Sequence, residues 1–205
     1  MSRISKRHQH WDEFRWEEEI RRDERRISGY FRELAGCLDL PDEEELIYGQ
    51  LSSQPDLVPF PETGESLRDY FGSSEDDDDE LPEHPANCRT VESSTVEELD
   101  MLCAEWNIFI AAKLPALFYS HALGCSCAFA KLLARTADFL EPEPDTSKAL
   151  QLSLGKRTLR DLNETVQLLS TMAGYHEFFR EKAENLISRL GEIRERLIAK
   201  LDSLR

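Results

Sequence analysis

The chain has 205 residues, of which 40% are hydrophobic and 32% charged, a composition typical of a water-soluble domain with one sizeable core. No apolar run reaches the roughly 20 residues needed to span a bilayer, and none follows the basic N-terminus as a secretory signal would require. The net charge of −16 argues against general nucleic-acid binding, which needs a cationic face.

Residues 8–36 predict an amphipathic helix in which acidic and basic residues alternate three or four apart and support one another. Its apolar stripe is thin, so we assign residues 1–36 to a helix that packs on the core of the protein. Aromatic residues with an arginine between them are typical of interface anchors. Trp11, Phe14 and Trp16 are therefore candidate partner-binding residues, although they could equally dock this helix onto its own chain.

Residues 37–93 carry 17 acidic and two basic residues, so almost the entire negative charge belongs to this segment. It is rich in proline and has no apolar period over SSEDDDDELPEHP, which predicts an irregular acidic loop or linker. Residues 42–51 are an exception, because they read as a short helix with Asp42 as its cap.

Residues 94–205 show apolar residues at helical spacing almost throughout. Ser94 and Glu97 have the spacing of a capping box at a helix start, Pro115 interrupts the pattern, and the prolines of EPEPDTS (141–147) end it. Asp145 or Thr146 is expected to cap the next helix, whose pattern weakens at residues 173–174. The fold class is therefore all-α, either an antiparallel helical bundle or a long kinked helical hairpin.

The last segment carries a stripe of apolar residues that alternate three and four apart, as in a seam between packed helices. Such a seam can pair with a partner or with a second copy of the chain. We therefore name as candidate partner-binding residues Leu186, Leu190, Ile193 and Leu197.

Two cysteines, Cys125 and Cys127, lie one residue apart in a stretch that reads as helix. Successive helical residues turn by about 100°, so these thiols point apart and cannot bind one ion together. His121 shares a face with Cys125, and His84 with Cys88 repeats that spacing, so a zinc site remains an alternative. The favoured interpretation is a helix interface lined by small side chains, with free, reduced thiols and no metal or other cofactor.

Lys156, Arg157 and Arg160 form the densest basic cluster of the C-terminal part and are candidate anion-binding residues. They could contact a nucleic acid, but a solvated helix face or a partner for the acidic loop is the simpler interpretation. His176 falls on the apolar stripe and reads as a core residue. No catalytic or phosphate-binding motif occurs.

The sequence thus predicts a non-catalytic, cytoplasmic helical-bundle protein that acts through protein–protein contacts, with another protein or a second copy as its partner. The alternatives are a regulator of nucleic-acid transactions that uses the basic cluster at 154–160, and a bundle that binds a metal or a small molecule. The first alternative predicts salt-dependent binding to DNA or RNA.

Overall fold

The computed structural model describes residues 10–37, 42–54, 91–113, 116–144, 146–175 and 177–205. Every regular element within these residues is a helix, which confirms the predicted all-α fold. The chain divides into two compact units, which we call the bundle unit (Met1–Glu13 with Asn87–Arg205) and the N-terminal unit (Phe14–Ala86).

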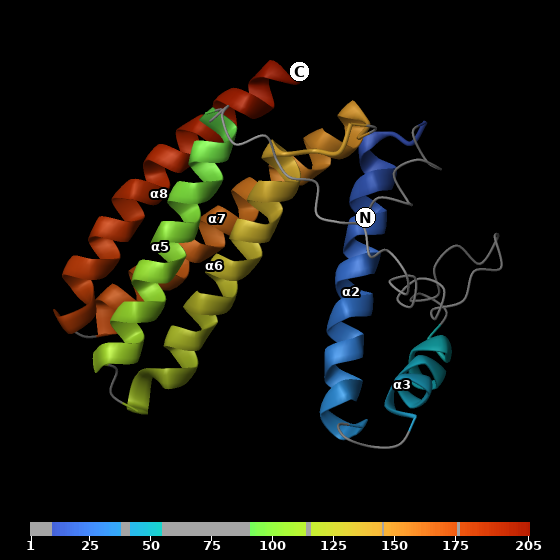
Figure 1. Cartoon of the computed structure of the whole chain (residues 1–205), viewed down its shortest axis with the longest axis horizontal. Helices are drawn as coiled ribbons and strands as arrows, with labels where there is room; N and C mark the ends of the chain where they lie inside the picture. The colour runs from blue at the N-terminus through green and yellow to red at the C-terminus, as the bar shows by residue number, and fades with distance from the viewer. Residues whose placement is uncertain (1–9, 38–41, 55–90, 114–115, 145, 176) are drawn as a thin grey trace, which may run out of the picture. The chain divides into compact units, whose positions relative to one another are not determined.

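The bundle unit is built from four described α-helices: α5 (Val91–Lys113), α6 (Tyr119–Leu140), α7 (Lys148–Tyr175) and α8 (Glu177–Ser203), with the short 3-10 helix η2 (Ala116–Phe118) before α6. Successive helices run in opposite directions (Figure 1). Helix α7 contacts both α6 and α8, and α5 contacts α6 and, less extensively, α8. The chain therefore forms an antiparallel bundle, and the alternative of a long kinked hairpin is excluded.

The core of the bundle is made of apolar side chains that all four helices contribute. Its largest fully buried members include Trp106 of α5, Phe129 and Phe139 of α6, Leu162 of α7 and Phe179 of α8. Complete burial of one such side chain stabilises the fold by about 1.5–3 kcal/mol. The apolar stripes of the sequence thus face one another inside a single chain.

The connection between α6 and α7 lies at residues 141–147, where the sequence predicts the reversal. The N–H of Leu150 donates to Ser147 Oγ at 3.2 Å, so Ser147 caps α7 and not the predicted Thr146; Asp145 lies outside the described residues. The weak point at 173–174 coincides with the end of α7 at Tyr175. The predicted helix start at Ser94 is wrong, because residues 91–93 already have helical conformation. Pro115 and His176 lie outside the described residues.

Helix α7 lies close to its neighbours at Gly155, which is buried. A Cβ atom placed there would lie 2.7 Å from Phe139 Cε2 and 2.8 Å from Leu201 Cδ1. Since real Cβ contacts are longer than 3.0 Å, only glycine fits between α6 and α8 without a shift of its neighbours.

The N-terminal unit holds α3 (Glu43–Ser52) and, from Phe14 onward, α2 (Glu13–Cys37). A small core joins the two helices, formed by Cys37, Ile47 and Leu51 with Tyr30, Leu34 and Tyr48 packed against it. The helix predicted at 42–51 is confirmed, but Asp42 has a left-handed backbone (φ 59°) and makes no side-chain cap.

Ion pairs three or four residues apart line α2, as the sequence predicts. The nitrogen–oxygen distances are 2.9 Å for Arg21–Glu17 and 2.8 Å for Arg22–Glu19. Arg26, which is fully buried, lies 2.7 Å from Glu19, so the charges on this helix do not all face water.

Most of the predicted acidic segment 37–93 lies outside the described residues. Among the helices that the structure describes, none combines the length and the apolar character that a membrane crossing requires.

Candidate functional site

The predicted seam on α8 faces the inside of the bundle unit. Leu186, Leu190, Ile193 and Leu197 have no exposed surface, because α8 packs against α7 and α5 of the same chain. Another molecule would contact these four side chains only after α8 had left the bundle. A partner of the folded chain must therefore use other residues.

The three N-terminal aromatic residues have different environments. Phe14 is 86% exposed and Trp16 only 3% exposed, while Trp11 is half-buried. Of the three, Phe14 is the side chain that a partner could contact directly.

The basic cluster on α7 does not form one open surface. Lys156 forms an ion pair with the Glu13 carboxylate, and the Arg160 guanidinium lies 3.1 Å from Asp161 Oδ1. Arg157 is only 2% exposed. Two of the three cations thus have carboxylate partners, and the third is buried.

The histidine and cysteines of α6 are not arranged as a metal site. Cys125 is fully buried, whereas the exposed His121 makes an edge contact with the Tyr175 ring, their centroids 5.0 Å apart. Within the part of the chain that the structure describes, no group of three or more potential metal ligands occurs. His84 and Cys88 lie outside it.

Cys125 and Cys127 differ in burial, so we expect their thiols to differ in reactivity. Burial raises the pKa of the Cys125 thiol to about 11, so its thiolate fraction near pH 8 is roughly 10⁻³. Cys127 is exposed. We expect a thiol reagent to modify Cys127 rapidly and Cys125 only after denaturation, as read by tandem mass spectrometry of the peptide that contains both.

The same labelling in urea, where both thiols should react, serves as the control. Equal modification of Cys125 and Cys127 in the native chain would contradict the burial of Cys125.

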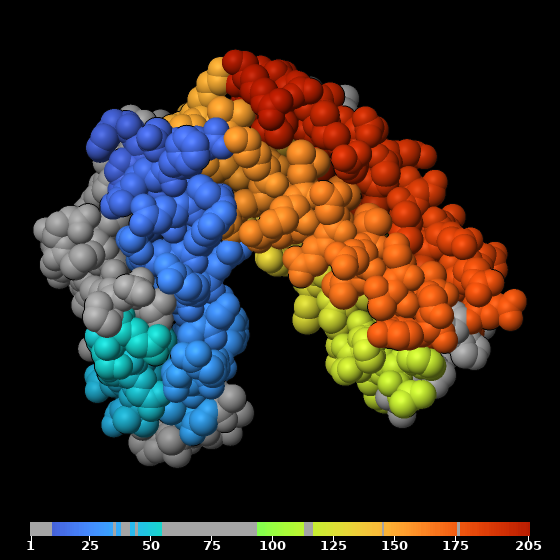
Figure 2. Space-filling model, turned by 180° about the vertical axis from the view of Figure 1, so that it is seen from behind, coloured from blue at the N-terminus to red at the C-terminus, as the bar shows by residue number. Residues whose placement is uncertain are grey.

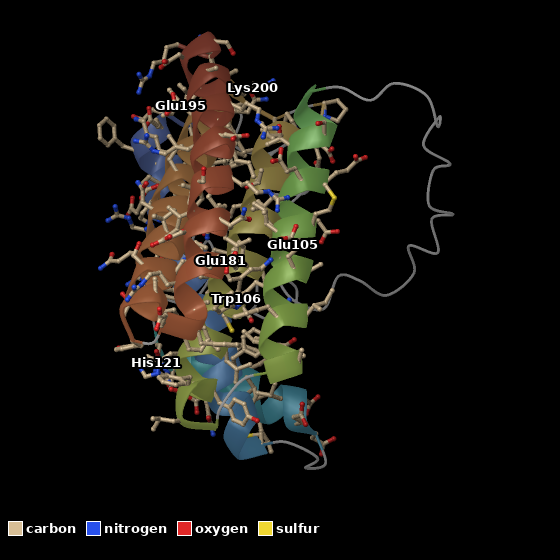
Figure 3. The ribbon with its side chains drawn as sticks, turned by 90° about the vertical axis from the view of Figure 1, so that its left-hand side faces the viewer. Glu105, Trp106, His121, Glu181, Glu195 and Lys200 are labelled. Carbon is tan, nitrogen blue, oxygen red and sulfur yellow. The ribbon has the colours of Figure 1, made fainter. Side chains whose placement is uncertain are left out.

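An aromatic cluster fills one end of the bundle, where α5 and α7 end and α6 and α8 begin. The rings of Phe109 and Phe178 stack with their centroids 4.9 Å apart, and Phe118 meets Phe179 edge-on at 5.3 Å. Trp106 Nε1 donates to the Ala122 carbonyl at 3.3 Å. Figure 3 shows Trp106 and His121 near this end of the bundle.

Charged residues are nearly absent from three of the segments that meet there, whereas the start of α8 carries Glu177, Arg180, Glu181 and Lys182. Between Trp106 and Ala130 the sequence contains one charged residue, Lys113, and residues 165–176 contain none, in a chain of which 32% of residues are charged. The contact between His121 and Tyr175 brings the two stretches together. The deficit of charge is therefore shared by neighbouring parts of α6 and α7.

Much of this region is open to solvent. We call the exposed residues of 117–130 and 165–175 the uncharged face; they are Leu117, Tyr119, Ser120, His121, Leu123, Gly124, Cys127, Ala130, Gln167, Ser170, Thr171, Gly174 and Tyr175. Leu117 is 82% exposed and Leu123 58%. Figure 2 shows the start of α6 (yellow-green) beside the end of α7 (orange). The face thus combines aromatic and aliphatic groups with uncharged polar ones such as Ser120, Gln167 and Ser170, and the depletion of charged residues is typical of an interface core.

On α5, the first charged residue beside the uncharged stretch is Glu105, which directly precedes Trp106. Arg189 and Lys182 of α8 each donate to Glu105 at 2.7 Å, and these bonds hold the pKa of the Glu105 carboxyl below its usual range, that to Arg189 most strongly. Arg196 donates to Glu98 and, at 3.2 Å, to Thr95 Oγ1. Polar contacts between α5 and α8 thus begin where the uncharged stretch ends.

Sequence reasoning missed the uncharged face, although part of its signal is visible in the sequence. The gaps in charge at 114–130 and 165–176 can be counted without a structure. That both gaps reach the same end of the bundle depends on how α6 and α7 pair, which the contact of His121 with Tyr175 fixes.

No family model matches this chain, and no match was found among curated proteins or solved structures.

Proposed function

We propose that this chain is a non-catalytic helical-bundle protein that acts by binding another protein molecule through its uncharged face. The observation that carries the proposal is the combination of open apolar side chains, such as Leu117, Leu123 and Tyr175, with the absence of charged residues from the stretches 117–130 and 165–175 that carry them. Isolated exposed leucines are ordinary on protein surfaces. A region that also lacks charge is typical of a buried interface core.

Physical chemistry gives such a face a use in binding. An ionised group that becomes buried without a partner costs several kcal/mol, and a surface without ionised groups avoids this penalty. Burial of an exposed leucine contributes about 1.5–3 kcal/mol. Burial of the uncharged face against another surface without charge is therefore energetically favourable.

Site-specific photo-cross-linking in the native host tests this proposal. A benzoyl-phenylalanine introduced at Leu123 is expected to give a covalent adduct with another protein molecule, because this side chain lies on the face. The same group at Ser188, which is exposed on α8, is the matched control and should give little or none. Absence of an adduct at Leu123, or equal adducts at both positions, would refute the proposal.

A further inference from the structure

We infer that the partner of the uncharged face is the same face of a second copy of this chain, in a two-fold symmetric dimer. This inference rests on the proposed function, since it names the molecule that covers that face. In a two-fold dimer the same residues of both copies meet, so the surface must be complementary to itself.

The absence of charged residues allows this face to pack against a second copy of itself. Its 13 residues include no Asp, Glu, Lys or Arg, so two copies bring no like charges together and leave no ionised group of the face without water. A foreign partner would need a second uncharged surface of the same extent, whereas a second copy supplies one by identity.

Long-range repulsion between two bundles is also weak. Residues 94–205 contain 14 basic and 16 acidic residues, so this part of the chain is close to neutral. The excess of negative charge lies in residues 37–93. The net charge of −16 therefore does not arise from the helices that would meet.

The extent of the face suits a dimer. Besides its 13 exposed residues, the stretches 117–130 and 165–175 present six half-buried ones: Phe118, Ser126, Ala128, Val166, Leu168 and Ala173. Stable interfaces use about 20–30 residues from each side. The 19 exposed and half-buried residues of the two stretches together therefore supply most of one side of a standard interface.

Two positions near the middle of the face allow a test that spares the fold. Leu123 is more than half exposed, so a lysine there keeps its charge in water in the monomer. At Gly124 an added Cβ would meet nothing within 4 Å, so a leucine there adds volume to the face without a clash inside the chain. Ser188 is the control position.

Sedimentation equilibrium of the full chain decides the inference. We expect a species of about twice the 23.7 kDa of one chain. Leu123→Lys and Gly124→Leu are each expected to weaken the dimer at least tenfold, because they introduce an unpaired charge or excess volume at its centre. Ser188→Lys should leave the dimer unchanged, and unaltered helical circular dichroism should show that all three variants are folded.

A chain that remains monomeric at about 100 μM overturns the inference, and so does a dimer that neither Leu123→Lys nor Gly124→Leu weakens. If the chain is monomeric while the photo-cross-link at Leu123 captures a different protein, the inference fails and the proposed function stands. If no adduct forms at Leu123 either, both fail.

Discussion

Replacement of Asp161 by alanine is expected to lower the free energy of unfolding by about 3 kcal/mol, the lower end of the range for breaking a buried ion pair. Asp161 is only 2% exposed, and its carboxylate forms ion pairs with three cationic side chains. Its carboxylate lies 3.0 Å from Arg135 Nε, 3.3 Å from Lys131 Nζ and 3.1 Å from Arg160 Nη2. The buried Arg157 lies one turn earlier on the same helix.

The loss is large because the cations remain. Arg135 is held at the α6–α7 contact with little exposed surface, so removal of the carboxylate takes a close counter-charge away from a largely buried cation, which is costly. Lys131 and Arg160 are nearly half exposed and can turn to water, which keeps the effect at the low end of the range.

Urea denaturation of the full chain measures this effect, with Glu164→Ala as the matched control. Glu164 is an exposed carboxylate less than one turn further along α7, and its removal should change the unfolding free energy by less than about 0.5 kcal/mol. Similar losses for Asp161→Ala and Glu164→Ala would show that the buried carboxylate has no special role.

The sequence predicts the fold class because apolar spacing is a direct record of which side of each helix is buried. The stripe through Leu186, Leu190 and Ile193 correctly indicates helix-on-helix packing. It does not say whether the opposing helix belongs to the same molecule, since a seam inside a bundle and a seam between two chains require the same spacing. The structure assigns this seam to the interior of one chain.

The basic cluster on α7 illustrates a second limit of the sequence. Lys156 and Arg157 are neighbours in sequence, but helical neighbours point about 100° apart. Lys156 is consequently exposed while Arg157 is buried. Composition alone treats both residues as surface cations. Which of them is buried depends on the side of α7 that packs against its neighbours.

The uncharged face needed both kinds of information. The sequence displays the gaps in charge, and the exposure of Leu117 and Leu123 follows from which side of α6 the rest of the bundle covers. Small residues such as Gly124 and Cys127 predict a close helix neighbour, but the structure describes both as exposed within one chain. This unused surface motivates the proposed dimer.

Two glycine-to-alanine substitutions are expected to change stability in opposite directions. Gly191→Ala in α8 should stabilise the chain by up to about 1 kcal/mol, the helix propensity difference between the two residues, because nothing lies within 4 Å of the added Cβ. Gly155→Ala brings the same propensity gain but places its methyl group against Phe139 and Leu201, both buried. Overpacking of this kind costs about 1–3 kcal/mol, so the net effect should be a loss.

The difference between the two substitutions isolates the packing term, because the change in helix propensity is common to both. We expect a difference of about 2 kcal/mol in urea denaturation and a larger one for Gly155→Val, whose branched side chain cannot avoid the Phe139 ring. In a chain that already carries Phe139→Leu, Gly155→Ala should cost less stability than in the unaltered chain, because the smaller side chain leaves room for the methyl group. The effects of the two substitutions are then not additive. Equal stabilisation by Gly155→Ala and Gly191→Ala would mean that α7 is not held this closely between α6 and α8.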